Sequence, residues 1–179
     1  MATRVLNRDS LRRLARAGVL TAIVDGAFSS VLSVAFYHST VARLFQGVAS
    51  TLLGRAALDG GTRTALIGLA MHVCVAFWWW STAFLLLVSW SERLRGVLAS
   101  PLGVFKVAAV YGPCIWLVMS LLVIPPLRHT PITFNIRWWV QLVGHFPFVG
   151  LPIVASIGRG LGDATNQTFA QGAAVTPSA

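Results

Sequence analysis

Four long apolar stretches, separated by shorter polar segments, dominate the hydrophobic pattern of the chain. They lie at about residues 17–37, 65–90, 104–124 and 138–157, and the second contains no formally charged side chain. A helix rises about 1.5 Å per residue, so about 20 apolar residues cross a hydrocarbon core of about 30 Å. The pattern therefore predicts an all-α fold, an integral membrane four-helix bundle.

The segment of about residues 41–58 has a mixed pattern. Its apolar residues recur at helical spacing, but Arg43, Ser50 and Arg55 interrupt them. Such a segment is too polar to cross a bilayer easily, so we expect an amphipathic helix that lies in the interface or folds back against the bundle. Residues 1–16 are predicted to form a basic N-terminal tail, and the Gly, Ala, Thr and Ser content of residues 158–179 predicts a disordered tail.

Local signals predict where the helices begin and end. Asp59-Gly60-Gly61 predicts a turn, after which Thr62 is expected to cap the second helix. The charged residues between Glu92 and Arg95 predict a short loop. Pro125-Pro126 is expected to end the third helix, because proline lacks the backbone N–H of a helix interior.

The composition fits a lipid environment. Of the residues 56% are hydrophobic and only 11% charged, and the mean hydropathy is +0.73. The net charge of +9 comes from basic residues that flank the apolar stretches, so anionic lipid headgroups are the expected partner and nucleic acid is not. With four spans, nine basic residues fall on the side of the chain ends and five on the other, so both termini are predicted to be cytoplasmic.

Small residues recur on one face of each of the first two predicted spans. Because lipid is as apolar as leucine, helices in membranes pack through close approach of small residues and through hydrogen bonds. These two faces are therefore predicted to pack against each other. Their small residues are Gly18, Ala22, Ser29 and Ser33 in the first span, and Gly68 and Ala76 in the second.

The candidate functional site is a set of polar residues inside the predicted spans. Asp25, His72 and His145 are ionisable, and Gln141 and Tyr111 accompany them. An aspartate at the centre of a spanning helix costs about 2.5 to 3.5 kcal/mol on insertion scales, so such residues are functional candidates. Counted from the expected helix ends, the two histidines lie at the same depth, and Asp25 lies nearer the midplane.

Three interpretations of these polar residues stay open. In the first they are structural and form hydrogen bonds between helices. In the second, Asp25 with His72 or His145 forms a protonatable pair that serves a transporter or channel. In the third, His72 and His145 ligate a haem between spans.

Motifs of soluble enzymes are not found. The sequence contains no phosphate-binding glycine loop, nucleophile elbow or HExxH zinc motif. Cys74 and Cys114 fall inside apolar spans without a metal-ligand spacing, so we expect no metal site and no disulfide. No reaction class follows, and an enzyme is not the favoured interpretation.

Two short motifs carry a resemblance. Through Gly68-Leu69-Ala70-Met71-His72 in the second span, and Gly144-His145 through Gly150-Leu151-Pro152 in the fourth, the chain resembles small four-span bacterial inner-membrane proteins of the YagU-like type over about residues 17–157. The resemblance implies a bacterial cytoplasmic (inner) membrane and four helices, but no activity or functional residue. We therefore expect a structural or interaction role, with a second copy or another membrane protein as partner. The alternative is a transporter or channel component.

Overall fold

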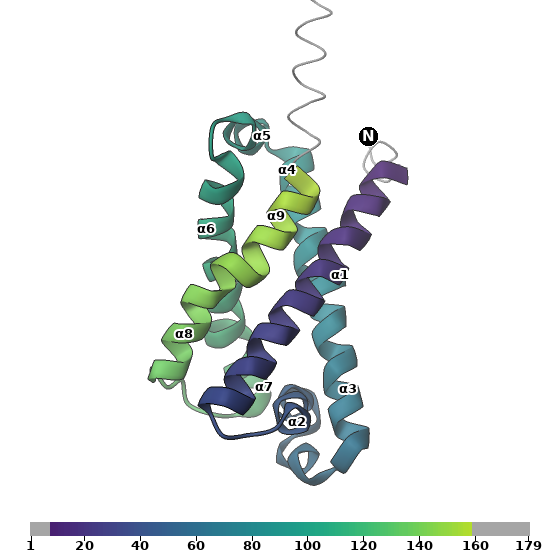
Figure 1. Ribbon diagram of the computed structural model, residues 1–179, viewed down its shortest axis with the longest axis vertical. Coiled ribbons are helices and arrows are strands. Elements are labelled where there is room, and N and C mark those ends of the chain that lie inside the picture. The colour runs from purple at the N-terminus through teal and green to yellow at the C-terminus, as the bar shows by residue number, and fades with distance from the viewer. Residues whose placement is uncertain (1–7, 159–179) are drawn as a thin grey trace, which may run out of the picture.

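Helices account for all the regular secondary structure in residues 8–158, the part of the chain that the computed structural model describes, with the side chain of Phe77 excepted (Figure 1). The predicted C-terminal tail and the start of the N-terminal tail lie outside this part. Four long helices are each apolar enough to cross a membrane. This confirms the prediction of an all-α four-helix bundle.

Each long helix consists of α-helical segments joined to a π-helical stretch (η2, η4, η5 or η6), in which backbone hydrogen bonds run from residue i to i+5. The first helix is α1 (Arg8–Val31) with η2 (Leu32–Phe36), and the second is α3 (Gly61–Cys74), η4 (Val75–Ser81) and α4 (Thr82–Trp90). The third is α6 (Gly103–Leu117), η5 (Val118–Val123) and α7 (Ile124–Arg128), and the fourth is α8 (Ile136–His145), η6 (Phe146–Gly150) and α9 (Leu151–Gly158).

The four helices alternate in direction, so the bundle has two distinct ends (Figure 1). We call the end where α1 begins and α9 finishes the terminal end. The opposite end, which holds α7 and the loop of residues 129–135, is called the distal end. At the terminal end a short helix, α5 (Glu92–Ala99), connects the second and third long helices.

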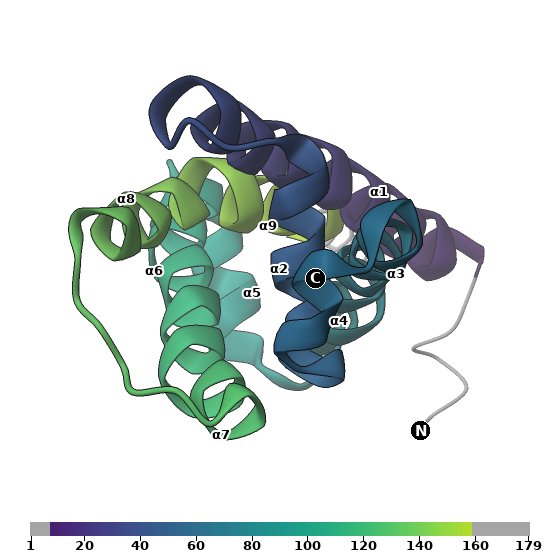
Figure 2. The same ribbon diagram turned by 90° about the horizontal axis from the view of Figure 1, so that it is seen from below.

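An amphipathic helix, α2 (Val41–Leu53), crosses the distal end between α1, α3 and α7 (Figure 2). It buries Phe45, Gln46, Ala49 and Ser50, and a 3-10 turn, η3 (Arg55–Asp59), follows it. Gly68 of α3 touches α2 so closely that a Cβ atom there would overlap the carbonyl of Phe45. The segment therefore folds against the bundle, which is one of the two arrangements predicted for residues 41–58.

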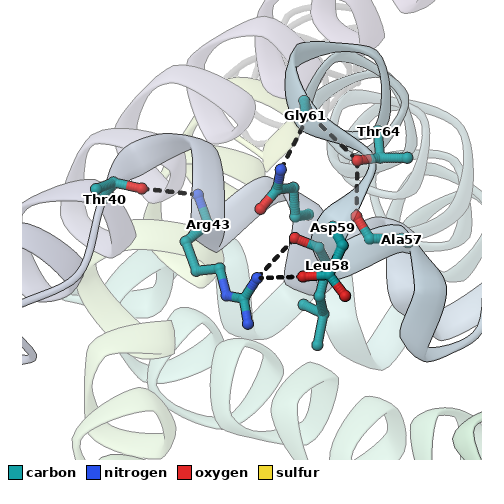
Figure 3. A network of polar contacts seen from close by, with 8 residues as sticks. Thr40, Arg43, Ala57, Leu58, Asp59, Gly61 and Thr64 are labelled. Atoms are coloured by element: carbon teal, nitrogen blue, oxygen red, sulfur yellow. Dashed lines mark hydrogen bonds and ion pairs between the residues drawn. The ribbon is translucent and has the colours of Figure 1, made fainter.

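Polar contacts fasten α2 to the start of the second helix (Figure 3). The Thr40 hydroxyl accepts a hydrogen bond from the backbone N–H of Arg43 at 3.0 Å and so caps α2. Two further hydrogen bonds start from side chains of α2: Arg43 Nη1 donates to Leu58 O at 2.6 Å, and Gln46 Nε2 donates to Gly61 O at 3.0 Å. A third joins α3 to the 3-10 turn, because Thr64 Oγ1 donates to Ala57 O at 2.7 Å. Asp59 lies 3.7 Å from Arg43 Nη1, exposed at the surface.

Two local predictions were wrong at the terminal end and at α3. Residues 92–95 belong to α5 and not to a loop, because Ser91 accepts a hydrogen bond from the N–H of Leu94 at 3.2 Å and caps the helix. Arg95 also reaches back to the carbonyl of Val88 at 2.8 Å, at the end of α4. The second helix begins at Gly61 with Gly60 as its N-cap, so Thr62 is not the capping residue.

The third helix also differs from its prediction. It continues through Pro125 and Pro126 and ends at Arg128. Both prolines lie in the first turn of α7, directly after the π-helical stretch η5, and a first turn does not use its backbone N–H groups within the helix. Proline is therefore tolerated here, where the sequence pattern indicated a helix end.

The apolar core lies toward the terminal end. It is formed where α1, α4, α5, α6 and α9 meet, and its buried side chains are Leu14, Ala17, Phe84, Leu85, Val88, Leu98, Ala108, Ile115, Val149, Ile153, Val154 and Ile157. These aliphatic and aromatic groups hold this half of the bundle together by close packing. The ionisable residues of the spans lie outside this core.

Candidate functional site

Asp25 of α1 and His72 of α3 lie side by side inside the bundle. His72 Nδ1 is 3.9 Å from Asp25 Oδ2, and each side chain is only 15% exposed. His72 Nε2 lies 3.2 Å from the carbonyl oxygen of Ala22, which precedes Asp25 by three residues on α1. Both ring nitrogens of His72 therefore face the first helix.

The bond to Ala22 determines how this pair can carry a proton. A carbonyl oxygen only accepts hydrogen bonds, so His72 Nε2 carries a hydrogen and donates it. In the neutral ring the other nitrogen, Nδ1, then has a lone pair that faces Asp25. One further proton can reside on the Asp25 carboxyl group or on His72 Nδ1, which gives either a neutral pair or an ion pair.

His145 of α8 is the third ionisable residue of the cluster. Its side chain is 8% exposed, and its Nδ1 donates to the carbonyl of Gln141 at 2.7 Å, one turn earlier. Asp25 interacts electrostatically with both histidines. We call Asp25, His72 and His145 the polar cluster.

Close helix contacts hold His145 in position. A Cβ atom at Gly112 of α6 would overlap the main-chain carbonyl of His145, so α6 and α8 approach at this point as only glycine allows. On the other side, Gly144 lies under the ring of Phe28, which stacks on Phe148 at 4.2 Å between centroids. The His145 backbone is therefore packed between the first and third long helices.

Two of the predicted site residues contribute differently. Gln141 supplies its main-chain carbonyl, which accepts from His145. Tyr111 is separate from the cluster, because its hydroxyl donates to the carbonyl of Trp80 at 2.7 Å and its ring lies 4.8 Å from that of Phe84. Tyr111 thus packs against the apolar core.

The predicted packing residues have several different neighbours. Gly18 and Ala76 are buried, Ser29 is half-buried, and Ser33 donates to the carbonyl of Thr40 at 3.3 Å. Ala22 supplies the carbonyl that holds His72. Gly68 packs on α2 and not on the first helix, because α2 lies between these helices at the distal end.

Other buried polar groups near the cluster were missed in the sequence. Within the described chain, several buried side-chain atoms have no hydrogen-bond partner, among them Trp116 Nε1, Trp138 Nε1 and Ser120 Oγ. The Trp116 ring lies 5.0 Å from that of His145. The spacing of Trp116 and Ser120, four residues apart on the third helix, was the available signal.

The cluster does not fit a haem held by His72 and His145. A bis-histidine haem needs one free ring nitrogen from each residue, aimed at iron from opposite sides. Here both nitrogens of His72 are directed at groups of α1. Among residues 8–158, no three or more His, Cys, Asp or Glu side chains gather as a metal site, and Cys74 and Cys114 are exposed free thiols.

Together, the four apolar helices and the partly buried polar cluster define the class of this chain: it is a multi-pass, all-α membrane protein. Comparisons with protein-family models, with curated proteins and with solved structures give no match. What the protein does therefore has to be argued from the cluster itself.

Proposed function

We propose that this protein is a component of a membrane transporter or channel that binds and releases protons. In this proposal a proton is exchanged between the side chains of Asp25 and His72 inside the bundle. The single observation that carries the proposal is the 3.9 Å contact between His72 Nδ1 and Asp25 Oδ2, with His72 Nε2 committed to Ala22. This arrangement presents an acceptor lone pair to a carboxyl group within the span. At 3.9 Å the two atoms lie outside hydrogen-bond distance, so proton transfer between them requires a small side-chain movement or a bridging water.

The geometry favours proton exchange over a purely structural role for Asp25. A structural aspartate in a bilayer is expected to have both oxygens bonded, because each unsatisfied group in hydrocarbon costs several kcal/mol. Asp25 Oδ1 is buried and has no partner within the described chain. His145 adds a second ionisable group beside Asp25, so a proton has more than one residue to occupy.

A structural or interaction role is the second candidate. It is favoured by Trp78 and Trp79, which are 66% and 65% exposed although they lie in the interior of the second helix. Tryptophan in membrane proteins is enriched at the two interfaces, not at mid-span. A second copy of the chain or another membrane protein would cover these rings.

Proton flux into liposomes tests the first proposal. The purified protein is reconstituted with a pH-sensitive dye inside, and a potassium gradient with valinomycin sets a membrane potential. We expect faster proton entry with the wild-type protein than with Asp25→Asn or His72→Ala. Asp59→Asn and His129→Ala are matched controls, because they make the same kinds of change at exposed positions outside the long helices.

Two outcomes would overturn the proposal. Flux that equals that of protein-free liposomes would remove the proton-handling role, and flux that Asp25→Asn leaves unchanged would remove the cluster from it. Loss of oligomeric assembly in Trp79→Ala, with no flux in any variant, would support the structural role instead.

We further propose a bacterial inner-membrane location with both termini in the cytoplasm. Support comes from the charge distribution of the described residues, in which seven basic residues belong to the terminal end and five to the distal end. The seven are Arg8, Arg12, Arg13, Arg16, Arg93, Arg95 and Lys106, and the five are Arg43, Arg55, Arg63, Arg128 and Arg137. Tags at the two chain ends, probed by protease in intact and permeabilised cells, should both be protected until the membrane is permeabilised. Cleavage of either tag in intact cells would contradict this orientation.

A further inference from the structure

A groove on the outside of the bundle lies between α4, α5 and α6, at the terminal end. Its volume is about 440 Å³, which falls within the range of about 300–1,000 Å³ of small-molecule sites. The second and third long helices form its sides, and the short helix α5 crosses its terminal end. We call it the terminal groove, and its lining includes Leu87 of α4, Leu94 and Val97 of α5, and Lys106, Val110 and Cys114 of α6.

Close packing fixes the shape of the terminal groove. A Cβ atom at Gly103, the first residue of α6, would overlap the carbonyl oxygen of Val97, so α5 is held against the start of α6. On the inner side of the groove, the rings of Phe84 and Tyr111 also line it, and their centroids lie 4.8 Å apart between α4 and α6. Packed elements therefore bound the groove both at its terminal end and toward the bundle.

The lining of the terminal groove is charged at one end and apolar along the rest. Lys106 is its charged residue and lies in the first turn of α6, next to α5. The hydroxyl of Tyr111 donates to the carbonyl of Trp80 at 2.7 Å, so its hydrogen is already used. Cys114 follows Lys106 by eight residues on the same helix, which is a distance of about 12 Å along the axis. The groove thus extends about 12 Å from a cation into apolar surroundings.

Two cations at this end have no acidic partner within residues 8–158. Lys106 makes neither an ion pair nor a side-chain hydrogen bond in that part of the chain, and the same holds for Arg93 of α5. Arg93 precedes Val97 by four residues, so the two side chains share a face of α5. Arg95 differs, because it donates to two main-chain carbonyls of α4 at 2.8 and 3.1 Å. Lys106 and Arg93 are therefore available to an anion at the charged end of the groove.

A second groove of the same volume lacks this charge. It lies between the first and fourth long helices and is lined by Phe28, Gly144 and Phe148, among others. None of its lining residues in the described chain is charged. A hydrocarbon chain of any lipid suits such a groove, so no headgroup preference follows from it. The cation at one end distinguishes the terminal groove.

We propose that the terminal groove binds one molecule of an anionic phospholipid, with an acyl chain along α6 and the phosphate at Lys106 and Arg93. The helix α5 is amphipathic and connects two spans, which places it at the level of the headgroups. A lysine near a helix end lays its apolar stem along hydrocarbon and holds its ammonium group at that level. A neutral headgroup such as phosphocholine carries its own cation, so an anionic lipid is favoured. The groove is separate from the polar cluster, and the proposal does not depend on proton exchange there.

Native mass spectrometry tests the headgroup contact. The purified protein in a non-ionic detergent is titrated with palmitoyl-oleoyl phosphatidylglycerol or with phosphatidylcholine of the same chains, and the Kd of the first bound lipid is measured. We expect the Kd for phosphatidylglycerol to be at least about fivefold lower, which is the effect of one basic residue near an anionic lipid. Lys106→Gln should raise this Kd about fivefold and leave that for phosphatidylcholine unchanged. Arg63→Gln is the matched control and should change neither, because it removes a cation from the first turn of α3 at the distal end.

Two further measurements test the position of the acyl chain. Val110→Trp puts an indole into the groove from an exposed position and should weaken binding of phosphatidylglycerol, whereas Val19→Trp makes the same change at an exposed valine of α1 outside the groove. Phosphatidylglycerol with a diazirine in one acyl chain is also irradiated with the wild-type protein. We expect it to attach within residues 106–114, and this result does not require any variant to fold.

Several results would overturn the lipid site. Equal Kd values for the two lipids, or equal effects of Lys106→Gln and Arg63→Gln, would remove the headgroup contact. Attachment of the diazirine lipid only outside the groove would remove the acyl-chain contact. A dimer that Val110→Trp dissociates, with lipid binding unchanged, would show that a second copy of the chain occupies the groove instead.

Discussion

The contact between α3 and α2 makes a quantitative prediction for Gly68→Ala. A Cβ atom at Gly68 would overlap the carbonyl oxygen of Phe45, and it would lie 2.6 Å from the Phe45 carbonyl carbon and 3.1 Å from the backbone nitrogen of Ala49. These are main-chain atoms of a hydrogen-bonded helix, so no side-chain rotation can relieve the overlap. Overpacking of this kind costs about 1–3 kcal/mol.

Gly47→Ala on α2 is the matched control, because no heavy atom lies within 4 Å of its added Cβ. Both substitutions gain about the same helix propensity, about 0.5–1 kcal/mol, which cancels in the comparison. We therefore expect the free energy of unfolding of Gly68→Ala to be about 1–3 kcal/mol below that of Gly47→Ala.

The assay is reversible unfolding of the purified protein in mixed micelles, followed by tryptophan fluorescence while the fraction of denaturing detergent is raised. Gly68→Ala should unfold at a lower fraction than Gly47→Ala. Equal midpoints for the two variants, or a higher one for Gly68→Ala, would refute the close approach of α2 to α3.

Three further substitutions test other contacts in the same unfolding assay. Gly112→Ala should lower the free energy of unfolding by about 1–3 kcal/mol, because its Cβ would overlap the main-chain carbonyl of His145, and wild-type stability would contradict this contact. Asn135→Ala should lower it by about 1 kcal/mol through loss of the N-cap of α8, and an unchanged midpoint would show that the cap is not formed. Tyr111→Phe should lower it by about 0.5–1.5 kcal/mol, since the carbonyl of Trp80 loses its buried donor; no change would place that hydroxyl in contact with lipid or water.

The number and type of the long helices could be predicted because membrane hydrocarbon imposes one simple requirement. A backbone that crosses it must satisfy its own hydrogen bonds over about 20 apolar residues, and that requirement is visible as hydropathy. The helix ends were harder. A run of charged residues and a pair of prolines both usually indicate that a helix is interrupted. Here the charged residues begin α5, which Ser91 caps, and Pro125 lies in the first turn of α7, where proline is tolerated.

The candidate site could be predicted in its ionisable residues but not in its geometry. Counting from helix ends separated Asp25 in depth from the histidines, whereas the structure places its carboxylate 3.9 Å from His72. The predicted depth of Asp25 was counted from residue 17 as the start of the first span, whereas α1 begins at Arg8. The predicted depth was therefore measured from the wrong helix end. At the distal end α2 lies between α1 and α3, and the periodicity of the sequence does not predict this position.

The polar groups around the cluster were missed for a different reason. Hydropathy treats Trp116 and Trp138 as apolar, so the indole N–H groups do not appear in a search for charge or buried carboxylates. They become recognisable only when the fold shows that these atoms are buried without partners. Tyr111 illustrates the converse, because a polar atom inside a span turned out to be fully satisfied by a main-chain carbonyl.

Infrared difference spectroscopy of the protein in lipid tests most directly whether Asp25 and His72 share a proton. The chain has only five carboxylic side chains, so the carboxylic C=O band of Asp25 can be isolated by comparison with Asp25→Asn. We predict that the spectra of the protein at acidic and alkaline pH differ by a carboxylic band that Asp25→Asn abolishes and His72→Ala shifts in frequency. A spectrum in which neither substitution alters any carboxylic band would contradict the account.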